Sequence, residues 1–278
     1  MTLGGQRLRS VALEERNTRS DLERRLSPRT AARLPVQLYC EGLSGGLQAV
    51  TNDVGTGGVC VQTRCLLATA SIRRLVVDLP DGPAELNAQG RWQRETAEGQ
   101  LTGICFIDPD KSAQRRLREF VYTRAAELAD FLVERTALSD LSLDEGLDLA
   151  LFTRFAEFSP RQLIYRQEAT DTAAGSSFIV YEGTVILKGY RSKGQPVAVG
   201  RIGVGGLFGG LPVLAGVPPV TSAYAEAASI LLEIDSYTFR YLQDAKPWVA
   251  RRLQRALISA EAANLRALVE RLGNDRRS

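Results

Sequence analysis

Alternating hydrophobic and polar positions dominate the part of the chain that follows its polar start. Residues 1–20 are polar, whereas residues 30–107 read as short strands separated by turns. VQLYC and GGVCVQT show the two-residue period of half-buried strands, with Val59 and Val61 on one face. Further strands are expected in IRRLVVDL, ELNAQGRWQRE and LTGICFID. Strands at this spacing predict a small barrel or sandwich.

A helical period replaces the strand period near Ser112. The stretch SAQRRLREFVYTRAAELADFLVERTAL carries apolar residues at 117, 120, 121, 128, 131 and 132, which form one stripe of a helix. The acidic DPDKS before it predicts a helix start with Ser112 as the cap. SDLSLDEG, residues 139–146, is expected to be a joint between two folded units.

The second half of the chain predicts strands and then a long helix. Residues 160–235 return to strand patterns, and SSFIVYEGTVILKGY indicates two strands joined by a Glu-Gly turn. Residues 247–272 predict a C-terminal helix. We therefore expect a β-roll bracketed by helices. The apolar residues of the last helix recur at coiled-coil-like intervals: Ile258, Leu265, Leu268 and Leu272.

Composition narrows the possible functions. The chain has 278 residues, enough for two domains, and a net charge of only +3, so an anion site requires local clustering of cations. It has no histidine, which excludes Ser-His-Asp and Cys-His catalysis and histidine-ligated zinc. No apolar run of 18 residues or apolar leader occurs, which predicts a cytoplasmic protein without membrane spans. The four cysteines lack CxxC spacing and are expected to be reduced and mostly buried: Cys40, Cys60, Cys65 and Cys105.

Two arginines in RRLSPR are candidate ligands for an anion. Arg25 and Arg29 are four residues apart, and Pro28 restricts Ser27 to extended or turn conformations, so the stretch is expected to be a loop. Each guanidinium offers a planar fork that suits phosphate. The same fork stacks on a base or binds the O6/N7 edge of guanine.

The stretch NDVGTGG complements these arginines. Three glycines within four residues permit close approach of the backbone to a ligand and positive φ angles. Asp53 offers an acceptor for the N1/N2 edge of guanine or for an arginine. Arginines for phosphate and an acceptor beside permissive backbone indicate a guanine-nucleotide site.

These two stretches resemble the motifs of the PilZ domain, RxxxR and [DN]xSxxG. Arg25 and Arg29 match the first motif, and Asp53 and Gly58 match the second. Gly55 departs from the pattern, which has serine at this position. The resemblance continues through PVQL, GRWQRE and GICFIDPD. It implies a six-stranded β-barrel that binds cyclic di-GMP.

The resemblance also implies roles for individual residues. Arg25 and Arg29 would bind phosphates and stack on guanine with help from Arg24, and Asp53 would face a guanine edge. Losing the serine hydroxyl weakens affinity by about two- to tenfold, because a neutral hydrogen bond is worth roughly 0.5–1.5 kcal/mol. The implied cyclic di-GMP ligands are Arg24, Arg25, Arg29, Asp53, Gly55, Gly57 and Gly58.

The second unit resembles the cyclic-nucleotide-binding β-roll of the cAMP-receptor type, over about 147–275. FIVYEGTVIL, the turn GVGGLFGGL and LLEID before a helix carry this resemblance. Gly210 stands where that family has the ribose-binding glutamate, and Pro219 replaces the arginine that neutralises the phosphate, although Arg201 is a substitute cation. A buried phosphate without its cation is poorly compensated, so ordinary cAMP binding is not expected. The degenerate pocket comprises Phe208, Gly209, Gly210, Leu211, Thr221 and Ser222.

The sequence thus predicts a mainly β protein with flanking helices and no catalytic residue, metal or cofactor. Its expected function is that of a bacterial signalling receptor that binds cyclic di-GMP and passes this event to the β-roll or to a protein partner. The predicted units are a flexible segment 1–20, a PilZ domain 21–130, a helical linker 131–146 and a β-roll with C-terminal helices 147–278.

Two alternatives stay open. One is an interaction or dimerisation module that binds no nucleotide, with a homodimer formed through the C-terminal helices. The other is an enzyme that uses carboxylates or a bound nucleotide, although the sequence shows neither a paired-carboxylate motif nor a P-loop. Direct DNA binding is not expected, because no helix-turn-helix follows the last helix.

Overall fold

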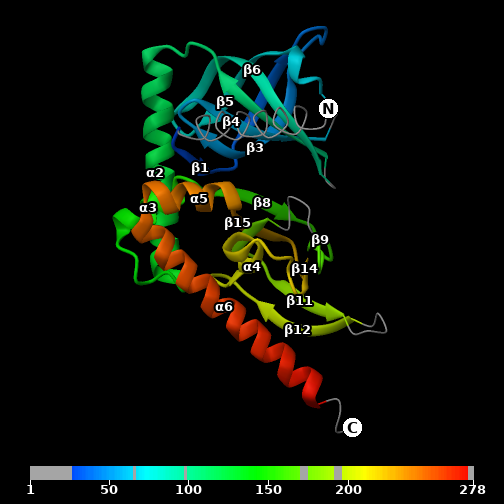
Figure 1. Ribbon diagram of the computed structural model, residues 1–278. Coiled ribbons are helices and arrows are strands. Elements are labelled where there is room, and N and C mark those ends of the chain that lie inside the picture. Colours follow the sequence, from blue (N-terminus) through cyan, green and yellow to red (C-terminus); the bar gives the residue numbers. More distant parts are fainter. Residues whose placement is uncertain (1–26, 65–66, 97–98, 170–174, 191–195, 275–278) are drawn as a thin grey trace, which may run out of the picture.

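The computed structural model describes residues 27–64, 67–96, 99–169, 175–190 and 196–274 (Figure 1). Its first part is a closed, six-stranded antiparallel barrel in the order β3-β2-β5-β6-β7-β4, because β4 also pairs with β3. The additional strand β1 lies along β3. The strands are β1 (Arg29–Ala31), β2 (Pro35–Cys40), β3 (Leu47–Gly55), β4 (Gly58–Thr63), β5 (Ile72–Leu79), β6 (Gly82–Thr96) and β7 (Gly99–Phe106), with a 3₁₀ helix at Thr69–Ser71.

The second part is a β-roll of two four-stranded sheets, which lies below the barrel in Figure 1. One sheet has the order β13-β10-β15-β8 and the other β12-β11-β14-β9. The predicted fold class, a barrel followed by a β-roll, is therefore confirmed. The strands are β8 (Arg154–Phe158), β9 (Leu163–Tyr165), β10 (Ser176–Glu182), β11 (Val185–Tyr190), β12 (Pro196–Ile202), β13 (Leu207–Phe208), β14 (Ser222–Ala225) and β15 (Ser229–Asp235).

Helices connect and flank the two parts. Helix α2 runs along the barrel to the roll, and α6 extends from this junction across the roll (Figure 1). None of the helices in the described ranges combines the length and apolarity that crossing a membrane requires. The helices are α2 (Lys111–Arg135), α3 (Leu143–Ala150), α4 (Gly210–Ala215), α5 (Ser236–Ala245) and α6 (Pro247–Asn274).

One expectation about a helix boundary is wrong. The cap of α2 is Asp110 and not Ser112, because the Asp110 carboxylate accepts a hydrogen bond from the Ala113 N–H at 2.8 Å. The expected joint 139–146 contains the start of α3, since its last four residues are the first four of this helix. Ser142 and Glu145 form a capping box that starts α3.

One hydrophobic core extends from the barrel into the roll. Buried side chains of α2, including Leu128 and Leu132, belong to the same cluster as Leu75 of the barrel and Phe155 and Leu232 of the roll. A second cluster fills the space between the two sheets of the roll. The barrel and the roll are therefore packed against each other through α2, and changes at this boundary affect both parts.

Candidate functional site

The structure brings Arg29 and Asp53 together on adjacent strands. Antiparallel pairing of β1 with β3 places Arg29 opposite Gly55 and Ala31 opposite Asp53. Residues two apart in a strand point to the same face, so the Arg29 side chain passes over Gly55 toward Asp53. Its Nη1 lies 3.4 Å from Asp53 Oδ1. The side chains are 29% and 9% exposed, and Arg29 Nε is buried without a partner among the described residues.

Gly55 provides the room for this arrangement. A Cβ atom at Gly55 would lie 2.6 Å from Arg29 Cγ and 3.1 Å from the Pro28 carbonyl oxygen. A side chain here therefore requires Arg29 to move. The departure from serine in the second motif thus has a structural consequence beyond the loss of a hydroxyl.

The other two glycines of this stretch have different roles. The expectation of positive φ angles is wrong, because Gly55 ends β3, Gly58 begins β4 and neither these residues nor Gly57 lies in the left-handed region. A Cβ atom at Gly58 would lie 2.4 Å from the Ile104 carbonyl oxygen, so the close backbone contact is with β7. A Cβ atom at Gly57 would lie 3.1 Å from Ser27 Oγ. The end of the predicted arginine loop therefore lies over this turn.

The N-terminal segment 1–20, Arg24, Arg25 and Cys65 lie outside the described residues. The predicted site is therefore represented by Arg29, Asp53 and the turn that follows β3. RRLSPR was expected to be a loop, but its last residue begins a short strand, because β1 pairs with β3.

Sequence reasoning missed the contacts between this site and the β-roll. The Arg29 N–H donates to the Leu151 carbonyl at 3.0 Å, and Asn52 Nδ2 donates to the Phe155 carbonyl at 3.2 Å. Arg33 forms an ion pair with Glu157 of β8. No local pattern signals these contacts, because the partners are more than 100 residues apart in the chain.

A buried ion pair lies in the roll close to these contacts. Arg154 of β8 donates from Nε and Nη2 to the two carboxylate oxygens of Glu233, each at 2.8 Å. Ser176 Oγ donates to the same carboxylate at 2.6 Å. Burial opposes the charge of Arg154, but the carboxylates of Glu233 and Asp235 outweigh it and raise the pKa of the guanidinium.

The described cysteines are free, in agreement with the expectation of reduced thiols: Cys40 and Cys60 are buried and Cys105 is half-buried. Cys60 lies opposite Asp53 in the β3–β4 pair. Its burial, reinforced by the Asp53 carboxylate, raises the pKa of the Cys60 thiol to about 12. The thiol is therefore protonated at neutral pH and is no nucleophile.

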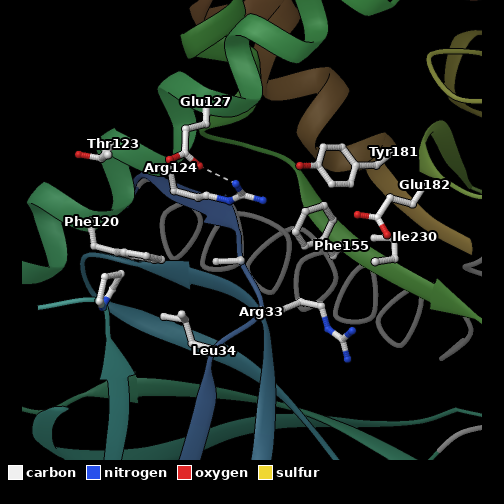
Figure 2. Close-up of a pocket in the computed structure, with 12 residues that line it drawn as sticks. Arg33, Leu34, Phe120, Thr123, Arg124, Glu127, Phe155, Tyr181, Glu182 and Ile230 are labelled. Atoms are coloured by element: carbon white, nitrogen blue, oxygen red, sulfur yellow. Dashed lines mark hydrogen bonds and ion pairs between the residues drawn. The ribbon is translucent and has the colours of Figure 1, made fainter. Parts of the chain in front are cut away.

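A pocket of about 390 Å³ lies near these contacts and is lined by residues of the barrel, α2 and the roll. Figure 2 shows the Arg124 guanidinium directed toward the rings of Phe155 and Tyr181, whereas Arg33 extends away from them. Arg124 also pairs with Glu127 on the same helix at 2.6 Å. The boundary between barrel and roll is thus a set of discrete polar links beside an open space.

The residues of the predicted second pocket surround the beginning of α4. Phe208 is fully buried and stacks on Phe178 with 5.4 Å between ring centroids. Gly209 caps α4 with a φ of 76°, and the Gly210 N–H donates to Glu261 Oε1 of α6 at 2.7 Å. Leu211 follows in the first turn of the helix. A carboxylate of the chain itself is therefore bound at this turn.

The other predicted members of that pocket are held by protein contacts. Thr221 is buried and hydrogen-bonds Tyr165, and Ser222 Oγ accepts from the Gln167 N–H at 2.8 Å. The expected substitute cation Arg201 is exposed and pairs with Glu226 at 2.6 Å. Sequence reasoning missed Glu261, whose helical context gives no local sign of this contact.

Comparisons with solved structures give matches of low identity and low structural similarity. A cyclic nucleotide-binding domain from Methylobacillus flagellatus shares 14% identity over 55% of this chain and 84% of that chain, with a TM-score of 0.47. The regulatory subunit of a cAMP-independent protein kinase A from Trypanosoma brucei shares 21% over 56% of this chain and 54% of that chain, with a TM-score of 0.41. The catabolite activator protein of Thermus thermophilus shares 22% over 49% and 61%, with a TM-score of 0.42.

This chain therefore spans about half of the length of the Trypanosoma subunit that it matches. No curated protein matches its sequence significantly. Residues 23–123 match the family model of the PilZ domain, and this range contains all seven strands of the first sheet. The barrel of this chain is therefore a PilZ domain.

Proposed function

We propose that this chain is a non-catalytic, cytoplasmic receptor for cyclic di-GMP that transmits dinucleotide binding from the barrel to the β-roll. The observation that carries the proposal is the position of Arg29. Its side chain meets Asp53 of the second PilZ motif, and its backbone N–H donates to Leu151 at the start of the roll. One residue thus belongs both to the candidate site and to the boundary between the two parts.

Binding is supported by the state of the Arg29 guanidinium. Its 3.4 Å contact with Asp53 is longer than the roughly 2.7–2.9 Å of a strong charge-assisted hydrogen bond, and Nε has no partner in the described part of the chain. A phosphate of cyclic di-GMP would bind the Arg29 guanidinium in place of Asp53, and the Asp53 carboxylate would accept hydrogen bonds from the N1/N2 edge of guanine. Exchange of a weak internal pair for two ligand contacts favours binding.

Transmission is supported by the links between β1, β3 and β8. A ligand that moves Arg29 or Asp53 shifts the strands that carry the hydrogen bonds to Leu151 and Phe155. The pocket beside Arg124 leaves space for β8 to change its position. We propose that the units divide as the sequence predicts, with the barrel unit at 21–130, the linker at 131–146 and the roll unit at 147–278.

A titration with cyclic di-GMP, cAMP and cGMP on one preparation tests the proposal. We expect micromolar or tighter binding of cyclic di-GMP by calorimetry, and no binding of the two mononucleotides. Hydrogen exchange of peptides covering 151–158 is expected to change only with cyclic di-GMP. Binding without such a change would refute transmission, and absence of binding would refute the receptor.

The alternative is an interaction module that dimerises through α6. Ile258, Leu265 and Val269 of α6 are 53%, 40% and 68% exposed and recur at intervals of seven and four residues. In this alternative, calorimetric titration shows no binding of cyclic di-GMP, and analytical ultracentrifugation shows a homodimer. A protein partner of the roll, whose identity the chain does not specify, would use the same helix.

Restoring the serine of the second motif tests the geometry of Gly55. We expect Gly55→Ser to raise the affinity for cyclic di-GMP about two- to tenfold, since the hydroxyl adds one hydrogen bond. The new Cβ atom also displaces Arg29 from Asp53 and frees its fork for phosphate. Calorimetry measures the effect. Gly200→Ser is the control, because a Cβ atom there meets no neighbouring atom within 4 Å, and a loss of affinity in Gly55→Ser alone would contradict this prediction.

A further inference from the structure

Glu261 of α6 binds the turn that begins α4. Its Oε1 accepts a hydrogen bond from the Gly210 N–H at 2.7 Å. Burial raises the pKa of Glu261, and backbone hydrogen bonds from Gly210, Gly209 and Leu211 oppose this rise. The carboxylate is therefore bound by a backbone N–H at the start of α4, between Gly209 and Leu211, and backbone turns bind anions through such N–H groups.

Gly210 makes this contact possible. A Cβ atom at Gly210 would lie 3.1 Å from Leu257 Cβ and 3.3 Å from Glu261 Cγ, so α6 packs directly on the backbone of the turn. A glutamate here, as the sequence resemblance leads one to expect, would require Leu257 or Glu261 of α6 to move by a few tenths of an ångström. The change to glycine and the presence of Glu261 are therefore parts of one arrangement.

Neither of the two positions expected to supply a cation for an external phosphate, 219 and 201, does so at this turn. Pro219, at the position of the expected arginine, is buried, and its carbonyl accepts from the Glu168 N–H at 2.9 Å. Arg201 is committed to Glu226 at the surface. The pKa of Tyr165, beside the turn, is raised mainly by burial and to a lesser extent by the charge of Glu261. This phenol therefore stays protonated and is not a second anion that could bind the turn in place of Glu261.

Contacts farther along α6 show what the turn fixes. A Cβ atom at Gly189 of β11 would lie 3.1 Å from Leu268 Cδ1, and Ala267 and Leu268 pack against the core of the roll. Glu261 lies between this contact and Leu257, which is buried against the turn. The hydrogen bond of the Glu261 carboxylate thus lies in the middle of the segment of α6 that packs on the roll.

We propose that Glu261 is a built-in ligand of the β-roll, whose carboxylate occupies the turn 209–211 and holds α6 in place without a bound nucleotide. This inference concerns the roll alone and holds whether or not the barrel binds cyclic di-GMP. It assigns to the turn a carboxylate of its own chain as the bound anion. The roll is then closed in every ligand state of the barrel, and α6 moves with it as one body.

Hydrogen exchange of 209–211 and of 257–270 tests this assignment in the full chain. We expect Glu261→Ala to speed exchange of the turn amides at least tenfold and to loosen α6. Glu261→Asp keeps the charge but is one methylene shorter, so it is expected to behave like Glu261→Ala. Glu261→Gln keeps an acceptor oxygen at the same reach and is expected to stay within about threefold of the original protein. Glu270→Ala removes an exposed carboxylate from the same helix and serves as the control.

Three results would overturn the proposal. Unchanged exchange in Glu261→Ala would show that the carboxylate does not hold the turn. If Glu261→Asp matched the original protein while Glu261→Gln matched Glu261→Ala, the negative charge near the turn, and not the hydrogen bond made at the reach of Glu261, would protect the turn amides. Protection of the turn by added cAMP in the original protein would show an external ligand there. If Glu261→Ala does not fold, the comparison of Glu261→Asp with Glu261→Gln decides the question.

Discussion

Replacing Arg29 with alanine is expected to lower the affinity for cyclic di-GMP at least tenfold. A hydrogen bond to a charged group contributes roughly 1.5–3 kcal/mol, which corresponds to a factor of about 10 to 150 in the dissociation constant. The variant also leaves the Asp53 carboxylate, which is 9% exposed, without its cation next to the bound phosphates. Calorimetric titration of both proteins at the same ionic strength measures the loss.

The variant isolates the guanidinium from the link to the roll. The hydrogen bond to Leu151 comes from the backbone N–H of Arg29 and is present in alanine as well. Arg29→Lys keeps the charge but loses the planar fork, so its affinity is expected between those of the original protein and Arg29→Ala. Arg74→Ala, which removes an arginine paired with Glu85 elsewhere on the barrel, is the control for net charge. Equal affinity of Arg29→Ala and the original protein would show that Arg29 does not bind the ligand.

Features encoded by local pattern were predictable from the sequence. The two-residue period found the strands of the barrel. The two motifs led us to expect Arg29 and Asp53 close together, and they are in contact because the chain returns after β2 to form β3 beside β1. Expectations about helix starts were less accurate. Asp110 and Ser112 are two residues apart and both are residue types that cap helices, so only the backbone conformation shows that Asp110 and not the expected Ser112 caps α2.

Contacts between distant residues were not predictable. Gly210 and Glu261 are 51 residues apart, and Arg154 and Glu233 are 79 apart. The period of hydrophobic and polar residues indicates which face of its own helix or strand a residue occupies. The partner of a polar side chain depends instead on how different helices and strands pack against each other. Gly210 appeared only as a missing glutamate in the sequence, whereas in the structure its missing side chain makes space for α6. A departure from a family pattern therefore does not reveal by itself what replaces the lost contact.

Replacing Arg154 with methionine is expected to lower the free energy of unfolding by about 3–5 kcal/mol at pH 7, because it leaves a buried carboxylate without its partner. Glu233 is only 7% exposed, and its carboxylate accepts hydrogen bonds from both Nε and Nη2 of Arg154. Urea-induced unfolding measures the change. Arg201→Ala breaks the exposed pair with Glu226 in the same roll and is expected to cost at most about 1 kcal/mol.

The double variant Arg154→Met/Glu233→Leu separates the loss of a contact from the burial of an unpaired charge. If the unpaired carboxylate is responsible, removing it as well restores most of the stability, because well-packed apolar residues replace a buried ion pair at little cost. If the double variant is as unstable as Arg154→Met, the ion pair itself stabilises the sheet. Equal stability of Arg154→Met and the original protein would contradict the buried pair altogether.

The pH dependence of this loss follows from the pKa of Glu233. Burial opposes its ionisation, but the charge of Arg154 and the hydrogen bonds from Arg154 and Ser176 outweigh burial and lower the pKa. The stabilising contribution is therefore complete above the unfolded value of about 4.3 and is lost as the pH falls through the lower folded value. Without Arg154, burial and the charge of Asp235 outweigh the remaining hydrogen bond from Ser176 and raise the pKa of Glu233, so protonation of Glu233 reduces the destabilisation of the variant as the pH falls. The stability difference between the two proteins is thus expected to be full at pH 7 and to shrink toward pH of about 4, and a difference independent of pH would show that the charge of Glu233 is not its cause.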